Sequence, residues 1–343
     1  METRKVQLSG GTTYTVSLPK SWAQEQGIDS GSLLYLHPEG DGSLLIESDD
    51  RRDAAERTVR LDVRRYDDDA LRETIEAMYV VGFDRLALVD ATGHSADRRR
   101  MIRDLTGRFS GFEVLETTET TLVLENLITA DNVSIRKSAL RLRLIMLAMH
   151  RDAVRAVVDN DPALARQVVR RDDEADKLFA MITRHFRRGL SDLQEVERLG
   201  NSRAELFEYY AVARQFERVA DHAEKIARLA HTRPDAPADP LAEAFSSAAG
   251  RAQRVVDTAA DVVLADADIS DAYDALGEVD ALVGELDELH RDLYDHESVG
   301  RAHFFGLLFD SVRRTAEYGG NIAELSIQRA MRRTGDRERR PEA

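Results

Sequence analysis

The sequence predicts a multidomain α+β protein made of a small β-rich domain, an α/β domain and a long helical bundle. Within the first fifty residues, apolar side chains alternate in strand fashion around glycine turns. From Asn132 onward, apolar positions recur at the three- and four-residue spacing of helices. Aromatic residues make up only 6% of the 343 residues, so leucine, valine and alanine must fill the core, which favours helices.

The composition limits the compartment and the partners. The chain contains no cysteine, which excludes disulfide bonds and thiolate metal sites and fits a reducing compartment. Its net charge of −15 repels nucleic acid overall, so a DNA-binding surface must concentrate positive charge locally. No apolar run approaches the roughly 18 residues that a membrane span needs, and the N-terminus lacks a signal-peptide pattern. We therefore expect a cytoplasmic protein without membrane insertion.

Residues 1–50 are predicted to form two hairpins on either side of a short helix. Pro19 ends the first hairpin, and the helix runs from Lys20 to Gln26, where Gly27 closes it. The second hairpin turns at Gly40-Asp41-Gly42. So short a segment cannot bury a core alone, and we therefore expect a homodimer held by this domain.

The first hairpin and the short helix share the stretch Gly10-Gly-Thr-Thr-Tyr-Thr-Val-Ser-Leu-Pro-Lys-Ser-Trp22. This stretch, with the glycines that follow it, resembles the AbrB/SpoVT-type swapped-hairpin modules. The resemblance implies a DNA-binding dimer in which Arg4, Lys5 and Lys20 contact phosphates. Residues 1–22 carry three cations against one acid, a local net charge of +2 that fits such contacts. The alternative is a module that only dimerises.

Residues 51–130 are predicted to form a second, α/β domain. A charged segment from Ser48 to Arg57 is expected to link it to the first domain. The predicted order of its elements is β-α-β-α-β-β, which indicates a small ferredoxin-like fold. Gly93 and His94 fall in a strand-to-helix loop, where a plain loop is a more common outcome than a ligand site.

Residues 131–332 are predicted to hold two tandem three-helix repeats, at 131–233 and 239–332. The segment His231 to Pro240 contains three of the seven prolines and is expected to be the linker between them. Aligning Glu217–Ala230 with Arg313–Ser326 gives five identities in fourteen positions, which supports the repeat. Residues 333–343 are expected to be a disordered tail.

A row of acids follows one helix of the first repeat. Glu217, Asp221 and Glu224 fall beside a buried face that is mostly alanine, so another helix or an ion could approach closely. A carboxylate pair at i, i+4 directs oxygens to one point, as hard cations require. The alternative is a solvated flank whose acids pair with Arg214, Arg218 and Arg228.

The segment Glu217-Arg-Val-Ala-Asp221-His-Ala-Glu-Lys-Ile-Ala227 resembles the acidic helix motif of the PhoU family, which is built from two three-helix repeats. The resemblance implies binding of iron, zinc, manganese or another divalent ion through Glu217 and Asp221. Asp172 and Asp176, also spaced i, i+4, are the candidate ligands on the preceding helix. In the second repeat Arg313 replaces the first acid, which opposes a metal, so Asp280 and Glu317 make a doubtful second site.

The complete domain order resembles archaeal regulators in which an AbrB-type module is fused to PhoU repeats. The resemblance implies a non-enzymatic regulator of phosphate uptake that binds DNA and senses phosphate status through a transporter, a sensor protein or a metal. One alternative is an adaptor that docks on a phosphate transporter or sensor without binding DNA. Another is a carboxylate-bridged di-iron enzyme, which is disfavoured because no Glu-x-x-His occurs and Asp287–His290 is the single Asp-x-x-His.

Overall fold

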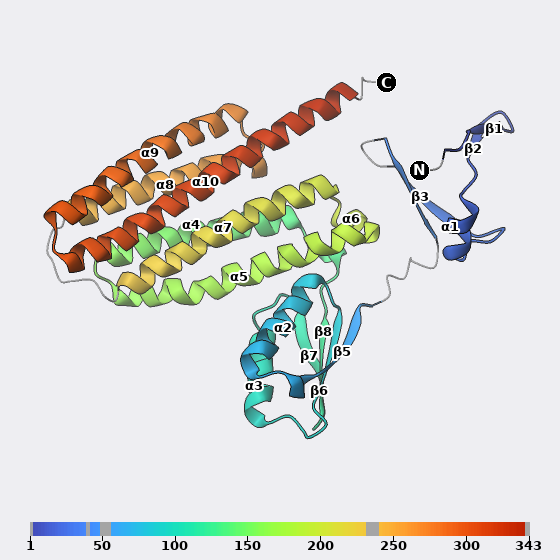
Figure 1. Cartoon of the computed structure of the whole chain (residues 1–343), viewed down its shortest axis with the longest axis horizontal. Helices are drawn as coiled ribbons and strands as arrows, with labels where there is room; N and C mark the ends of the chain where they lie inside the picture. The colour runs from blue at the N-terminus through green and yellow to red at the C-terminus, as the bar shows by residue number, and fades with distance from the viewer. Residues whose placement is uncertain (1–2, 39–41, 49–55, 231–239, 340–343) are drawn as a thin grey trace. The chain divides into compact units, whose positions relative to one another are not determined.

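The computed structural model of the chain describes residues 3–38, 42–48, 56–230 and 240–339. It divides into two compact units, Met1–Ala55 and Glu56–Ala343, the second holding both the α/β domain and the helical bundle (Figure 1). The predicted multidomain α+β class is confirmed. No helix within the described ranges combines the length and the apolar character that crossing a bilayer requires. The predicted linkers at 48–57 and 231–240 lie mostly outside the described residues.

The N-terminal unit consists of two hairpins and one short helix, as predicted. Its elements are β1 (Gln7–Ser9), β2 (Thr13–Thr15), α1 (Lys20–Glu25), β3 (Leu34–Pro38) and β4 (Leu44–Ser48). β1 pairs with β2 and β3 pairs with β4, each antiparallel and each a separate two-stranded sheet. Gly10 and Gly11 both adopt positive φ, which lets the first hairpin turn tightly. Across residues 3–38 and 42–48, every side chain remains at least partly exposed.

The α/β domain places two helices on a four-stranded sheet. Its main elements are β5 (Thr58–Asp62), α2 (Asp68–Val81), β6 (Arg85–Val89), α3 (Ala96–Thr106), β7 (Phe112–Thr117) and β8 (Thr121–Asn126). Short 3₁₀ turns follow β5 and β8, at Val63–Arg65 and Ala130–Asn132. Side chains from both helices and from the sheet form a core of their own, separate from that of the bundle. The predicted order β-α-β-α-β-β is therefore confirmed.

The ferredoxin-like prediction for this domain is wrong in strand order. The sheet runs β5-β6-β8-β7, with β5 and β6 parallel and directly hydrogen-bonded to each other. A ferredoxin-like fold has the order β-α-β-β-α-β and splits its βαβ units. Here β7 and β8 form a tight hairpin, and β8 pairs with β6. Periodicity predicted the elements correctly, but strand neighbours depend on pairings between distant segments.

The bundle contains six long helices in two sets of three. The first set is α4 (Ile135–Val158), α5 (Pro162–Ser191) and α7 (Arg203–Ala230), and the second is α8 (Pro240–Leu264), α9 (Ile269–His296) and α10 (Val299–Arg339). A short helix that periodicity did not predict, α6 (Leu193–Leu199), follows α5. Side chains from both sets share one continuous hydrophobic core. α5 begins as predicted, with the Asp161 carboxylate accepting hydrogen bonds from the backbone N–H groups of Ala163 and Leu164.

The disordered tail predicted from residue 333 is wrong for the described residues. α10 continues to Arg339, beyond the end of the second predicted repeat. Arg333 donates a hydrogen bond to Asp266 at 2.7 Å, which holds the beginning of this extension against the end of α8. No proline interrupts the helical sequence before Pro341. Residues 340–343 lie outside the described part of the chain.

Two arginines of α5, one buried and one partly buried, hold the α/β domain on the bundle. The Arg184 side chain is only 1% exposed and donates to the carbonyl oxygens of Tyr79 and Phe83, at 2.8 and 2.7 Å, and to Asp84 at 2.7 Å. Arg188 donates to the Gly82 carbonyl at 3.0 Å and to the same carboxylate at 2.7 Å. These carbonyls belong to the last turn of α2 and the residues just after it, where the Tyr79 oxygen also accepts from the Gly82 backbone N–H at 3.0 Å. α5 therefore belongs structurally to both domains.

Candidate metal centre

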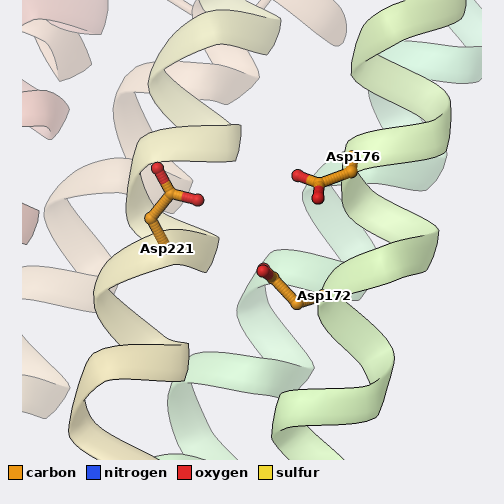
Figure 2. Close-up of side chains that lie close together, drawn as sticks. All are labelled: Asp172, Asp176 and Asp221. Carbon is orange, nitrogen blue, oxygen red and sulfur yellow. The ribbon is translucent and has the colours of Figure 1, made fainter. Parts of the chain in front are cut away.

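Three aspartates from two neighbouring helices converge at one place on the first three-helix set. Asp172 and Asp176 lie one turn apart on α5, and Asp221 lies on α7 (Figure 2). One carboxylate oxygen from each residue lies within 4.8 Å of those of the other two. All three side chains point into the space between the two helices. The structure thus assembles three of the four acids that the sequence predicted.

Small side chains on both helices allow this close approach. Ala175 on α5 and Ala220 and Ala223 on α7 are fully buried beside the three aspartates. An alanine brings two helix backbones closer together than a leucine or phenylalanine does. The alanine-rich face that the sequence indicated is therefore the reason that carboxylates from different helices come within reach of one ion.

The three carboxyl groups oppose each other's ionisation. Partial removal from water, followed by the charges of Asp176, Glu224 and Asp221, raises the pKa of Asp172 to about 7. The same two causes, with Asp221 as the main neighbouring charge, raise the pKa of Asp176 to about 6. The pKa of Asp221 is raised as well, by partial removal from water and then by Glu224. Asp176 and Asp221 nevertheless remain exposed residues, and only Asp172 is half-buried, so solvent weakens these effects. Like charges held this close are unfavourable unless a cation or a proton neutralises them.

Glu217 lies beside the three aspartates and is electrostatically coupled to them. Burial, then the charges of Asp221 and Asp176, raises its pKa to about 7. Its carboxylate is not among the oxygens that lie within 4.8 Å of one another, so its role as a ligand stays a prediction. The solvated-flank alternative holds for Glu224, which accepts a hydrogen bond from Arg228 at 2.6 Å.

The donor set is chemically suited to a hard cation. The Oδ1 atom of Asp172 is buried and has no hydrogen-bond partner in the described part of the chain. In those same residues no arginine or lysine forms an ion pair with any of the three aspartates, although the salt bridges occupy many acids elsewhere. Carboxylate oxygens without nitrogen or sulfur ligands favour manganese, magnesium or calcium over zinc.

In the second repeat, Arg313 occupies the position that Glu217 occupies in the first. Arg313 donates to Glu317 at 3.0 Å and to Asp287 at 2.5 Å, and Arg314 donates to Glu317 at 2.9 Å. Asp280 is exposed on α9 and belongs to no group of converging ligands among the described residues. Glu317 and Asp287 are thus neutralised by arginines of the same chain, as expected from the position of Arg313.

The other residues that the sequence singled out take separate places. Arg4 and Lys5 are exposed ahead of β1, and Lys20 is the exposed first residue of α1. Gly93 has φ +92°, and His94 is buried with its Nε2 atom 3.1 Å from the carbonyl oxygen of Leu88. This contact gives His94 a structural role in the loop.

Sequence reasoning missed one residue that bears on the aspartates. Arg108, in the loop just after α3 of the α/β domain, donates to Asp173 at 2.5 Å and lowers the pKa of Asp176. No local pattern connects Arg108 with an acid 65 residues later in the chain. Glu224, which the sequence placed on the same row, raises the pKa values of Asp172 and Asp221.

Comparisons with known proteins identify two domains. Residues 139–230 match the family model described as PhoU domain, and residues 7–53 match the model described as antidote-toxin recognition MazE, bacterial antitoxin. PhoU from Pseudomonas aeruginosa matches with 22% identity and a TM-score of 0.45, over 57% of this chain and 95% of that one. The phosphate transport system regulatory protein PhoU from Streptococcus pneumoniae matches with 18% identity and a TM-score of 0.44, over 56% and 91%. No curated protein matches the chain.

The PhoU resemblance is therefore confirmed as a PhoU domain, and the swapped-hairpin resemblance as a MazE-type N-terminal domain. All four predicted acids of the first repeat, Asp172, Asp176, Glu217 and Asp221, lie within the matched PhoU residues. The second three-helix set lies outside them. The archaeal origin that the resemblance implied stays a prediction.

The raised carboxyl pKa values predict that the stability of the metal-free chain falls above pH 6.5. Asp172 and Glu217 have folded pKa values near 7 against ordinary values of 3.8 and 4.5, so the folded state binds more protons than the unfolded state between about pH 4 and pH 7. Stability is therefore lost as the pH rises through the folded values. His150 and His222, whose pKa values are lowered to about 4, change stability only below about pH 6.5.

Thermal melts with chelator between pH 6.5 and 8.5 measure this effect. Asp172→Asn should reduce the loss of stability with rising pH, because it removes one of the repelling charges. It should raise the melting temperature at pH 8.5 by about 3 °C. Asp280→Asn, on an exposed aspartate of α9, is the matched control and should leave the profile as it is. Identical profiles for Asp172→Asn and the unaltered chain would show that the acids do not repel one another appreciably.

Proposed function

We propose that this chain is a regulator of phosphate transport in which a cation-binding PhoU domain is joined to a DNA-binding, dimerising N-terminal domain. The observation that carries the proposal is the position of the three converging aspartates inside the matched PhoU residues. The MazE-type match at residues 7–53 supports the DNA-binding part. The connection with phosphate transport rests on the family, one of whose members is described as a phosphate transport system regulatory protein.

The sensory part of the proposal is a cation site on α5 and α7. Asp172, Asp176 and Asp221 would supply the ligands, with Glu217 at the edge of the same group. A divalent cation neutralises charges that otherwise repel one another, so binding stabilises the folded chain and not the unfolded one. Manganese suits the oxygen donors better than zinc does, and iron is a further candidate because the PhoU resemblance implies it.

Cation binding predicts a melting temperature that depends on chelator. A ligand at a hundredfold excess over its Kd stabilises the folded state by about 2.7 kcal/mol. Manganese or ferrous iron should therefore raise the melting temperature of the chelated chain by several degrees. Asp221→Asn should abolish the shift, whereas Glu317→Gln should keep it because Glu317 is paired with Arg313 and Arg314. A melting temperature that neither chelator nor added metals change would show that these acids form a solvated flank and bind no cation.

The dimer part of the proposal rests on the exposed apolar surface of the N-terminal unit. Eight large apolar side chains are between 38% and 76% exposed there: Val6, Leu8, Tyr14, Val16, Leu33, Leu36, Leu44 and Leu45. An isolated two-stranded hairpin is marginally stable in water, and this unit has two of them and no buried side chain in its described residues. A second copy of the same domain would cover these side chains.

Removal of the N-terminal unit should therefore convert a dimer into a monomer. Sedimentation velocity of a chain that starts at residue 51, compared with the full chain at equal concentration, measures this directly. Leu36→Glu in the full chain should weaken the dimer in the same way, because it adds a charge to the apolar surface. If the shortened chain stays as dimeric as the full one, the α/β domain or the bundle forms the interface.

The DNA part of the proposal predicts a salt dependence carried by Arg4, Lys5 and Lys20. Each lost phosphate contact should flatten the slope of log K against log salt by about one unit and weaken binding to all sequences alike. Fluorescence anisotropy with a duplex of mixed sequence, for the triple alanine variant over a salt series, provides the test. Arg155→Ala, on an exposed arginine of α4, is the control. Unchanged affinity and slope would favour an adaptor that docks on a transporter or sensor without binding DNA.

A further inference from the structure

The α/β domain lies along the same helix that carries two of the candidate ligands. At one end of this contact, Arg184 and Arg188 of α5 hold the end of α2 through buried hydrogen bonds. At the other end, the loop after α3 reaches α5 beside the acidic group. There Arg108 Nη2 donates to Asp173 Oδ1 at 2.5 Å, and Lys177 Nζ donates to the carbonyl oxygen of Gly107 at 2.9 Å.

The two ends of this contact differ in strength. The Arg184 guanidinium is buried with three acceptors, and loss of such a partner is strongly destabilising. The side chains of the Arg108–Asp173 pair are 59% and 56% exposed, and exposed ion pairs contribute little to stability. The domain is thus fixed at the buried end, while the loop at Gly107 and Arg108 can leave α5 at small cost.

The exposed end of the contact adjoins the candidate ligands directly. Asp173 directly follows Asp172 in the sequence, and Lys177 directly follows Asp176. The loop therefore contacts α5 at the residues next to two of the candidate ligands. The positive charge of Arg108 acts on Asp176 from the other domain, and it favours the ionised carboxylate. This arginine therefore supplies part of the positive charge that a bound cation would supply.

We propose that Arg108 is a built-in counter-ion that competes with the cation and sets the affinity of the acidic group on α5 and α7. The inference rests on the proposed cation site and adds its regulation by the α/β domain. A dication between the aspartates repels the guanidinium, which loosens the loop from Asp173 while the Arg184 end stays in place. Cation occupancy thereby reaches the α/β domain as a local release of Gly107 and Arg108 from α5, while Phe109 stays packed in the core of that domain.

The experiment measures manganese affinity of the full chain by isothermal titration calorimetry at low and high salt. Arg108→Ala should lower the Kd about fivefold at low ionic strength, since it removes a repelling charge near the site. The difference should shrink at high salt, because exposed charges are screened. Arg108→Lys keeps the charge and should stay within about twofold of the unaltered chain. Arg103→Ala, on an exposed arginine of the same helix α3, is the matched control.

Hydrogen exchange supplies a second readout. The amides of Gly107 and Arg108 should exchange faster when manganese is added to the unaltered chain, whereas Phe109 and the end of α2 should stay protected by the core and by Arg184. An equal or weaker manganese affinity for Arg108→Ala, or a tightening that salt does not change, overturns the inference and leaves the proposed site intact. If the unaltered chain gives no manganese response at all, the proposed site fails and this inference fails with it.

Discussion

The fold of the second unit depends on the guanidinium group of Arg184, which is buried away from water. Burying the charge of Arg184 carries a desolvation penalty of several kcal/mol, which only well-placed partners offset. Those partners are Tyr79, Phe83 and Asp84, all at the end of α2 or just after it. Because the acceptors belong to one domain and the donor to the other, the α/β domain and α5 hold each other in place. The same contact brings the loop after α3, with Arg108, alongside α5.

Close packing of α5 against α7 creates the opposite electrostatic situation. Fully buried alanines bring α5 and α7 together, and three aspartates then lie with oxygens within 4.8 Å of one another. A chain selected only for stability would pair these acids with arginines, as the second repeat does through Arg313. Repelling carboxylates at a well-packed helix junction are therefore a local conflict of the kind that marks functional sites.

Periodicity and caps predicted the helices closely because each is a local property of the chain. α5 begins at Pro162 after an Asp161 cap, and α7 buries the alanine row that placed Asp221 beside it. What the sequence could not provide were pairings between distant segments. The order β5-β6-β8-β7, the Arg184–Asp84 contact and the approach of Arg108 to α5 all join residues that no local pattern relates. Local patterns thus predicted the acids that converge on α5 and α7, but not the residues that surround them.

The two repeats differ by one substitution in how their acids are neutralised. They align across Glu217 and Arg313, and in the second repeat that arginine reaches both Glu317 and Asp287. An arginine is permanently charged, whereas a bound metal ion would come and go with its concentration. In the described part of the chain, the converging aspartates lie in the first repeat, and Arg108 of the α/β domain contacts α5 next to them. A signal read through the proposed cation site would arise on α5 and α7, because those are the helices whose charge balance an added ion would alter.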